Sequence, residues 1–277
     1  MQGQLSLEGI PGKLVRVTPA KLATWEACPR KFRMTYLDRP APTRSGARAN
    51  ATLGAVVHNA LKAFFELPAA ERTPEQAVLL VRRCWKSDGF ADLRQADEHR
   101  ERAQRWVADY VERLDPAAEP VAVERWVSAA AGTIIAEGRV DRVDRRGGAL
   151  VIVDYKTGRR APTDEDARDS RALALYAVAA RKTLRDRTGR VELHHLPTGR
   201  VGSWEHTEDS LDGHVRRAEE LAGELRTASD AFEEGTGGDS TFPARPGARC
   251  GWCEFRAHCP EGQRAAPAEA PWAGLAE

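Results

Sequence analysis

The stretch GRVDRVDRRGGALVIVDYKTG, residues 138–158, decides the fold. Its first half has the composition of a strand, and two glycines after two arginines indicate a tight turn. The run that follows, ALVIV, is apolar without interruption, which is typical of a strand buried on both faces of a sheet. Polar residues and a glycine then end this strand. We therefore predict two neighbouring strands, over 132–146 and 149–158, joined by a turn.

The segments on either side alternate between strand and helix patterns. A strand is predicted over 120–130, and a hairpin is predicted from 190–196 and 200–207 around the turn Pro-Thr-Gly. Helical spacing of apolar residues, or a polar-faced helical pattern, predicts helices over 18–37, 51–67, 74–87, 96–114, 164–183 and 207–233. This order favours an α/β fold with a mixed central sheet flanked by helices.

We expect a single domain over residues 1–277, opening with a leader and a short strand within residues 1–17. A helical part with Cys28 and His58, a sheet core, a C-terminal helix with a cysteine cluster and a tail would follow, over 18–118, 119–206, 207–260 and 261–277. The tail is rich in Ala, Pro and Glu, so we expect it to be disordered.

The composition is that of a globular protein: 42% of the 277 residues are hydrophobic and 30% are charged, with a formal net charge of +1. This charge excludes a global basic field, although a local basic groove remains open. No apolar run approaches the roughly 18 residues that span a bilayer, and the first residues lack a secretory pattern. We therefore expect a cytoplasmic protein without a membrane partner. Its clustered cysteines should then bind a metal or an iron–sulfur cluster rather than form disulfides.

Asp141, Asp154 and Lys156 form the strongest candidate site. Asp154 and Lys156 are two residues apart at the end of the apolar strand, so the period of a strand puts them on one face. Asp141 lies in the preceding strand and approaches Asp154 if the two strands are antiparallel. Two carboxylates and a backbone carbonyl make a hard-oxygen site suited to Mg²⁺ or Mn²⁺. Lys156 would orient or deprotonate a water, or stabilise charge on a phosphoryl group.

The competing interpretation is that an Asp and a Lys at a strand end are solvated turn residues, as such short motifs commonly are. The apolar strand before them and the acidic strand beside it favour a functional site. Arginines that flank these motifs are candidates for a phosphate groove, although many surface arginines are only solvated. They are Arg30, Arg33, Arg159, Arg160, Arg168 and Arg171.

The motif pair GRVDRVD and DYKTG resembles the RecB-like branch of the PD-(D/E)XK nuclease superfamily. LGAVVHNAL is similar to the family's G-x-x-x-H helix and singles out His58, and VERWV is similar to a strand that contains Glu124. ALALYAVAA is similar to the Q-x-x-x-Y helix, with Tyr176 in the Tyr place. The usual Gln is replaced by Ala172, beside Arg171, which weakens substrate positioning but leaves the metal ligands and the lysine in place. The resemblance covers roughly residues 18–260.

The resemblance implies a restriction-endonuclease-like core and a metal-dependent DNA nuclease, exonuclease-like, that acts on DNA ends or single strands in repair or recombination. Lys156 would be the catalytic lysine and Glu124 a lesser candidate, whereas Tyr176 is either part of the site or a core residue. The ligands of Mg²⁺ or Mn²⁺ would be His58, Asp141, Asp154 and the carbonyl of Tyr155.

Two other functions stay open. The chain could be a non-catalytic DNA-binding module that assists a separate helicase, which Ala172 favours and the complete set of Asp141, Asp154 and Lys156 disfavours. It could also be a zinc-stabilised interaction protein. Metal-dependent cleavage of DNA tests the first alternative, and a visible spectrum after anaerobic purification tests the second.

Three cysteines, Cys250, Cys253 and Cys259, lie in RCGWCEFRAHCP, residues 249–260. We predict that Cys28, in WEACPRKF, is the fourth ligand, since Cys84 has the flanks of a thiol within a helix. This arrangement resembles the split four-cysteine site of AddB-type nucleases and CRISPR adaptation nucleases. Four thiolates suit either zinc or a [4Fe–4S] cluster, and the resemblance favours the cluster. The alternative is a zinc site that uses His258 and the three C-terminal cysteines.

Overall fold

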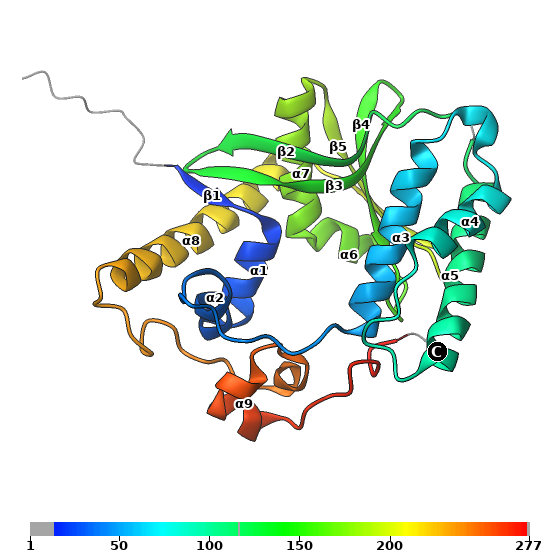
Figure 1. Cartoon of the computed structure of the whole chain (residues 1–277). Coiled ribbons are helices and arrows are strands. Elements are labelled where there is room, and N and C mark those ends of the chain that lie inside the picture. The colour runs from blue at the N-terminus through cyan, green and yellow to red at the C-terminus, as the bar shows by residue number, and fades with distance from the viewer. Residues whose placement is uncertain (1–13, 116, 276–277) are drawn as a thin grey trace, which may run out of the picture.

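The computed structural model describes residues 14–115 and 117–275, so most of the expected leader lies outside the described residues. Within them, helices cover both faces of one sheet (Figure 1). The α-helices are α1 (Pro19–Ala27), α2 (Pro29–Tyr36), α3 (Ala49–Phe65), α4 (Pro74–Cys84), α5 (Leu93–Glu112), α6 (Asp164–Asp169), α7 (Arg171–Leu184), α8 (Glu208–Glu233) and α9 (Pro260–Ala265). Short 3₁₀ turns are η1 (Ala69–Glu71), η2 (Ala248–Trp252) and η3 (Arg256–His258).

Over the described residues the sheet has six strands: β1 (Val15–Val17), β2 (Ala122–Ala131), β3 (Ile134–Arg146), β4 (Ala149–Lys156), β5 (Thr188–His195) and β6 (Val201–Glu205). β3 lies between antiparallel β2 on one side and, on the other, parallel β1 at its start and antiparallel β4 at its end. β4 pairs in parallel with β5, which pairs antiparallel with β6. The prediction of an α/β fold with a mixed, helix-flanked sheet is confirmed.

β4 joins two hydrophobic clusters, as its uninterrupted apolar run predicts. Val151 and Val153 pack with α3, α4 and α5 on one face, whereas Leu150 and Ile152 pack with α7 on the other. All four side chains are at most 1% exposed. Burial on both faces makes β4 a rigid element, and its last residues therefore hold fixed positions at the end of the sheet.

Two predicted helices are each divided by a single residue. The helix predicted over 18–37 breaks at Cys28, whose backbone is extended (φ −167°) because Pro29 disfavours a helical residue before it. The helix predicted over 164–183 breaks at Ser170, whose hydroxyl accepts a hydrogen bond from the backbone N of Leu173 and caps α7. The break at Cys28 leaves this cysteine at a corner between two helices.

The expectation of a disordered tail is wrong for the part that the structure describes. Residues 262–275 complete α9 and then run to the face of the sheet that α3, α4 and α5 cover. Leu275 is 6% exposed and packs in the cluster that contains α3. Arg159 donates hydrogen bonds to the carbonyls of Leu275 (2.6 Å) and Ala273 (2.5 Å). One apolar anchor and one arginine thus compensate for a composition that by itself indicates disorder.

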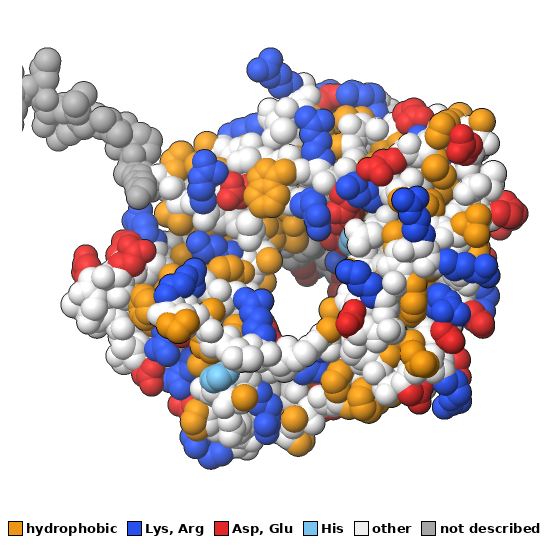
Figure 2. All heavy atoms as spheres, in the orientation of Figure 1, with side chains coloured by type: hydrophobic (Ala, Val, Ile, Leu, Met, Phe, Trp, Pro, Cys, Tyr) orange, Lys and Arg blue, Asp and Glu red, His pale blue; other side chains and the backbone are white. Residues whose placement is uncertain are grey.

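An opening lies at the centre of the face drawn in Figure 2, with Lys and Arg side chains around its rim. Figure 1 shows the sheet above it, α1 to one side, α3 to the other, and the connection between α2 and α3 below. This connection, residues 38–48, rests on the cysteine-bearing segment: Ser45 N donates to Glu254 O (2.8 Å) and the guanidinium of Arg48 lies 5.0 Å from the ring of Trp252. We call residues 38–48 the strap.

No helix in the described ranges is both long and apolar enough to cross a membrane.

Candidate active site

Asp141 and Asp154 meet where β3 and β4 pair. Arg142 lies opposite Val153 in the antiparallel register, which places Asp141 beside Asp154. A side-chain oxygen of Asp141 accepts a hydrogen bond from the backbone N of Tyr155 at 2.8 Å. Lys156 Nζ lies 2.5 Å from Asp154 Oδ2. The structure therefore brings these side chains together in the arrangement that the strand period and the antiparallel turn predict.

His58 reaches this site from α3. Its Nδ1 lies 3.4 Å from both Glu124 Oε1 and Asp141 Oδ1. One ligand atom from each of these three residues falls within 4.8 Å of the others, a spacing that a single metal ion can bridge. Asp154 stands beside this group and is paired with Lys156.

Glu124, a lesser candidate from the sequence, is one of the three residues of this group. Its backbone adopts a left-handed conformation (φ 46°), which is costly for a residue with a Cβ. The register of β2 with β3 skips this residue, pairing Val123 with Arg142 and Arg125 with Val140. The carboxylate is consequently turned toward His58, and its side chain is only 7% exposed. Left-handed conformation at one strand residue has no signature in the sequence.

The clustered carboxylates of the site change the protonation of their neighbours. Burial by itself would lower the pKa of His58, but hydrogen bonds and attraction from Asp141 and Glu124 outweigh it and raise this pKa to about 10. Burial, with the negative charge of Asp141, raises the pKa of Asp154, although Lys156 opposes the shift. Such a group of carboxylates gains from a bound cation, and carboxylates with one imidazole suit Mg²⁺ or Mn²⁺.

Tyr176, on α7, lies over Gly138 of β3. A Cβ at residue 138 would come 2.6 Å from Cε1 of Tyr176, so only glycine permits this approach. Burial, with the charges of Asp154 and Asp141, raises the pKa of Tyr176 to about 12. The phenol therefore keeps its proton near the acidic site. Tyr176 thus lies close to the carboxylates and also packs against the hydrophobic cluster under α7.

The Q-x-x-x-Y pattern has a glutamine where this chain has Ala172, and Arg171 does not take over the place of that glutamine. Its guanidinium forms a forked pair with Glu26, with both terminal nitrogens 3.1 Å from Oε2, and so ties α7 to α1. The other arginines proposed for a phosphate groove are also engaged within the molecule. Arg30 pairs with Glu261, Arg33 with Asp239, Arg159 with the tail carbonyls, Arg160 with Asp166 and Arg168 with Asp169.

The sequence interpretation missed Arg139, which lies between Gly138 and Asp141 in the central motif. Its Nε lies 2.8 Å from Glu124 Oε2, and its side chain is 67% exposed. Arg139 lines a cavity of about 290 Å³ together with His58 and Glu124. Its position within the motif GRVD is the sequence signal by which it could have been found.

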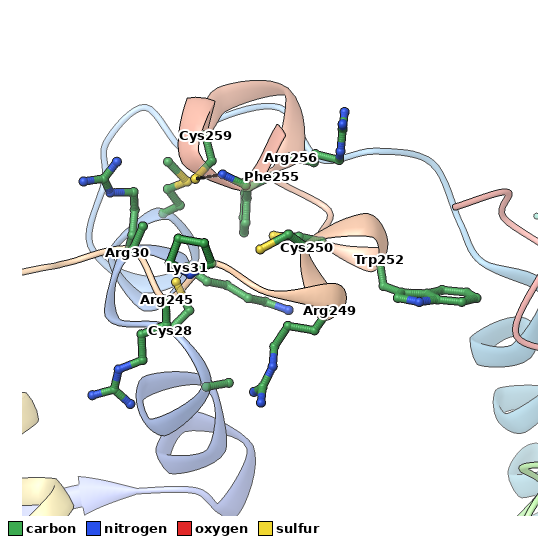
Figure 3. Close-up of a pocket in the computed structure, with 16 residues that line it drawn as sticks. Cys28, Arg30, Lys31, Arg245, Arg249, Cys250, Trp252, Phe255, Arg256 and Cys259 are labelled. Atoms are coloured by element: carbon green, nitrogen blue, oxygen red, sulfur yellow. Dashed lines mark hydrogen bonds between the residues drawn. The ribbon is translucent and has the colours of Figure 1, made fainter. Parts of the chain in front are cut away.

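Four cysteines line one cavity of about 220 Å³ below α1: Cys28, Cys250, Cys253 and Cys259. In Figure 3, Cys28, Cys250 and Cys259 come from three separate segments and turn their sulfurs toward a common space. The backbone N of Gly262 donates a hydrogen bond to Cys259 Sγ at 3.4 Å. Among the described residues, however, no three cysteine sulfurs lie within 4.8 Å of one another.

The two competing ligands lie elsewhere. Cys84 ends α4, is half-buried, and packs against the hydrophobic cluster of α3, α4 and α5. His258 is exposed and its Nε2 lies 2.9 Å from the carbonyl of Thr43 on the strap, to which it donates. His258 thus supports the strap and does not face the cysteine cavity.

No curated protein matches this chain. Among solved structures, a putative exonuclease from Eubacterium rectale is similar, at 11% identity and a TM-score of 0.48, covering 93% of this chain and 94% of that one. A second similar structure, SSO0001, has 14% identity and a TM-score of 0.38, with 92% and 90% of the two chains covered. The family model of the PD-(D/E)XK nuclease superfamily matches residues 16–260, which include the paired strands, His58 and all four cavity cysteines. The chain belongs to the PD-(D/E)XK nuclease superfamily.

Proposed function

We propose that this protein is a divalent-metal-dependent DNA nuclease that hydrolyses phosphodiester bonds from DNA ends or in single strands. The observation that carries the proposal is the convergence of His58, Glu124 and Asp141 beside the ion pair of Asp154 and Lys156. Asp141 and Asp154 of this group lie where β3 pairs with the buried strand β4. The expected setting is DNA repair or recombination in the cytoplasm. A separate helicase, one candidate partner from the sequence, finds no support in the fold or in the family match.

Each residue has a chemical part in this proposal. His58, Glu124, Asp141, Asp154 and the carbonyl of Tyr155 would hold Mg²⁺ or Mn²⁺, which neutralises charge on a phosphoryl group and makes a bound water more acidic. The ammonium of Lys156 stabilises negative charge that develops on the phosphate oxygens, or orients the attacking water. Tyr176, which keeps its proton, would donate a hydrogen bond to the substrate at the edge of the same site.

The opening supports a substrate that is single-stranded and has an end. Its rim carries Lys and Arg side chains, and the strap completes the border opposite the sheet (Figure 2). A DNA strand that occupies such a space is surrounded by protein and must enter by an end. We expect rapid degradation of linear single strands and little cutting of closed circles.

We further propose that Cys28, Cys250, Cys253 and Cys259 hold a [4Fe–4S] cluster. A tetrahedral zinc ion brings its sulfurs to about 3.8 Å from one another, since each Zn–S bond is about 2.3 Å. The four cysteines line a shared cavity of about 220 Å³, which has room for a group larger than a single ion. Arg30, Lys31 and Arg249 also line the cavity; Arg30 and Lys31 are paired with Glu261 and Glu254, and Arg249 adds positive charge that complements a thiolate-bound cluster.

One anaerobic preparation tests both parts. It is assayed with Mg²⁺, Mn²⁺ and EDTA on end-labelled linear and on circular single-stranded DNA, and its visible spectrum is recorded. Metal-dependent loss of the linear substrate with little loss of the circle, and broad absorption near roughly 400 nm, are expected. No cleavage with either ion would contradict the nuclease, equal cleavage of both substrates would contradict entry by an end, and a colourless zinc-loaded protein would contradict the cluster.

A further inference from the structure

Trp126 is more than half exposed on the surface of the sheet. Its exposed fraction is 55%, compared with 37% for Trp204 and 40% for Trp272. Tryptophans contribute most when their large apolar surface is covered. A sheet residue this exposed is therefore a candidate for contact with something outside the chain, provided that its neighbours indicate what that is.

The neighbours of Trp126 belong to the metal group. Trp126 on β2 lies opposite Arg139 on β3, and opposed residues of paired strands project from the same face about 5 Å apart. Glu124 precedes Trp126 by two residues, so their Cα atoms are at most about 7 Å apart. Arg139 connects the two, since its Nε is 2.8 Å from Glu124 Oε2. The indole thus lies roughly one nucleotide's length from the residues that would hold the metal.

Arg139 adds a cation to this aromatic surface. The ion pair with Glu124 is made through Nε, and the side chain remains 67% exposed, so it is open to a ligand. An exposed aromatic ring beside an exposed guanidinium is a combination that binds single-stranded nucleic acid. The base stacks on the ring and the phosphate pairs with the cation. On the face of Trp126, the next residue of β2 is Ser128, which lies opposite Glu137 of β3, so these neighbours of the ring are polar. An apolar protein interface is therefore a poorer fit.

We propose that Trp126 and Arg139 form a subsite for the nucleotide next to the scissile phosphate of single-stranded DNA. The indole stacks on the base and Arg139 contacts its phosphate. The subsite rests on the proposed nuclease function for its meaning, but its binding is independent of cleavage. Stacking tolerates every base, so the subsite positions the strand without selecting a sequence.

Trp204 offers a matched control. It is also exposed, and the guanidinium of Arg168 lies 5.6 Å from its ring. It belongs to β6, however, which is four strands from β2 in the sheet, about 19 Å at the usual strand spacing. Both tryptophans are thus exposed and have an arginine nearby, although Trp126 is the more exposed of the two, and they differ in their distance from the metal group.

Binding of a fluorescent single-stranded oligonucleotide is measured by anisotropy in EDTA with the full chain. Trp126→Ala should weaken binding by roughly 5- to 150-fold, the range for losing one stacked base. Trp126→Phe should recover most of the affinity, and Trp204→Ala should stay within about twofold of the wild type. Equal effects of Trp126→Ala and Trp204→Ala, or no loss in Trp126→Ala, would overturn the subsite.

Oligonucleotides with one abasic nucleotide at successive positions then locate the contact. The wild type should lose affinity at one position, and Trp126→Ala should lose nothing further there. An equal additional loss in Trp126→Ala would mean that the stacked base lies on another residue. Since no divalent ion is present, a protein that shows this pattern but never cleaves DNA would contradict the nuclease proposal and leave the subsite standing.

Discussion

The carboxylate of Asp141 accepts a hydrogen bond from the backbone nitrogen of Tyr155 across the β3–β4 pair, at 2.8 Å. This contact holds the end of β4 against β3 and thereby orders the two residues that flank Tyr155, Asp154 and Lys156. The ring of Tyr155 packs edge-on against the imidazole of His58, with centroids 5.7 Å apart. One backbone position thus links the acidic pair, the lysine and the histidine.

We expect Asp154→Ala and Lys156→Ala each to reduce metal-dependent cleavage at least about 100-fold, which corresponds to about 2.7 kcal/mol of barrier. Asp154 supplies negative charge to the metal site and Lys156 acts on the water or the phosphoryl group. Cleavage rates at saturating Mn²⁺ provide the measurement, with circular dichroism and DNA binding as checks of the fold. Lys62→Ala is the matched control, because the side chains of Lys62 and Lys156 are 48% and 46% exposed. Wild-type cleavage by the Asp154, Lys156 double variant would refute this active site.

Gly138→Ala should disturb the site through Tyr176. The added Cβ would come 2.6 Å from the ring, so the tyrosine must move away from the carboxylates or the strand must shift. We expect a loss of stability of about 1–3 kcal/mol, typical of overpacking, together with lower activity. Gly223→Ala in α8 is the control, since a Cβ there meets nothing within 4 Å and alanine favours helix. Urea unfolding of both variants measures the difference, and equal stabilities would show that Tyr176 yields without cost.

The environment of Glu192 leads us to predict that the fold loses stability in acid. It is 2% exposed and accepts hydrogen bonds from Arg146, Arg190 and His194. Burial by itself would raise the pKa of Glu192, but these donors and their charges lower it from 4.5 to about 2. The carboxylate therefore stabilises the fold fully above pH 4.5, and this stabilisation is lost as the pH falls toward 2.

The depressed pKa of Glu192 is equivalent to about 3 kcal/mol of stability at pH 7. Glu192→Gln should thus be less stable than the wild type at pH 7, and the difference should shrink to roughly 1 kcal/mol at pH 3. Denaturant unfolding at the two pH values checks this, with the exposed Glu205→Gln as control. A difference that is the same at both pH values would show that the donors do not depend on the charge of Glu192.

The predictable part of the site is the part determined by strand geometry. An uninterrupted apolar run followed by Asp154 and Lys156 specified a central strand, its end and a shared face, and the glycine turn specified the antiparallel partner that carries Asp141. The left-handed backbone of Glu124 and the exposure of Trp126 arise from tertiary contacts and could not be read from neighbouring residues. The tail was misjudged because Ala, Pro and Glu indicate disorder, whereas a single buried Leu275 and the hydrogen bonds from Arg159 hold it.

Cys28→Ser and Cys84→Ser separate a cluster ligand from a buried thiol. Cys28 lines the cavity shared with Cys250, Cys253 and Cys259, whereas Cys84 packs in a hydrophobic cluster. A cluster bound by these four residues connects the start of the fold to its end, so its loss removes a cross-link that restricts the unfolded chain. After anaerobic purification we expect Cys28→Ser to lose iron, visible absorption and thermal stability, and Cys84→Ser to retain all three.

Loss of the cluster should also change the cleavage reaction, because the strap rests on the cysteine-bearing segment. Residues 38–48 rest on the cysteine-bearing segment through the hydrogen bonds of Ser45 with Glu254 and of His258 with Thr43, at 2.8 and 2.9 Å. Without the cluster this segment loses its support, the strap detaches, and the opening is no longer closed. Residual cleavage by Cys28→Ser should therefore discriminate less between linear and circular single strands than cleavage by Cys84→Ser does. A fully loaded cluster in Cys28→Ser would exclude Cys28 as a ligand, and undiminished discrimination in an iron-free protein would show that the strap holds without it.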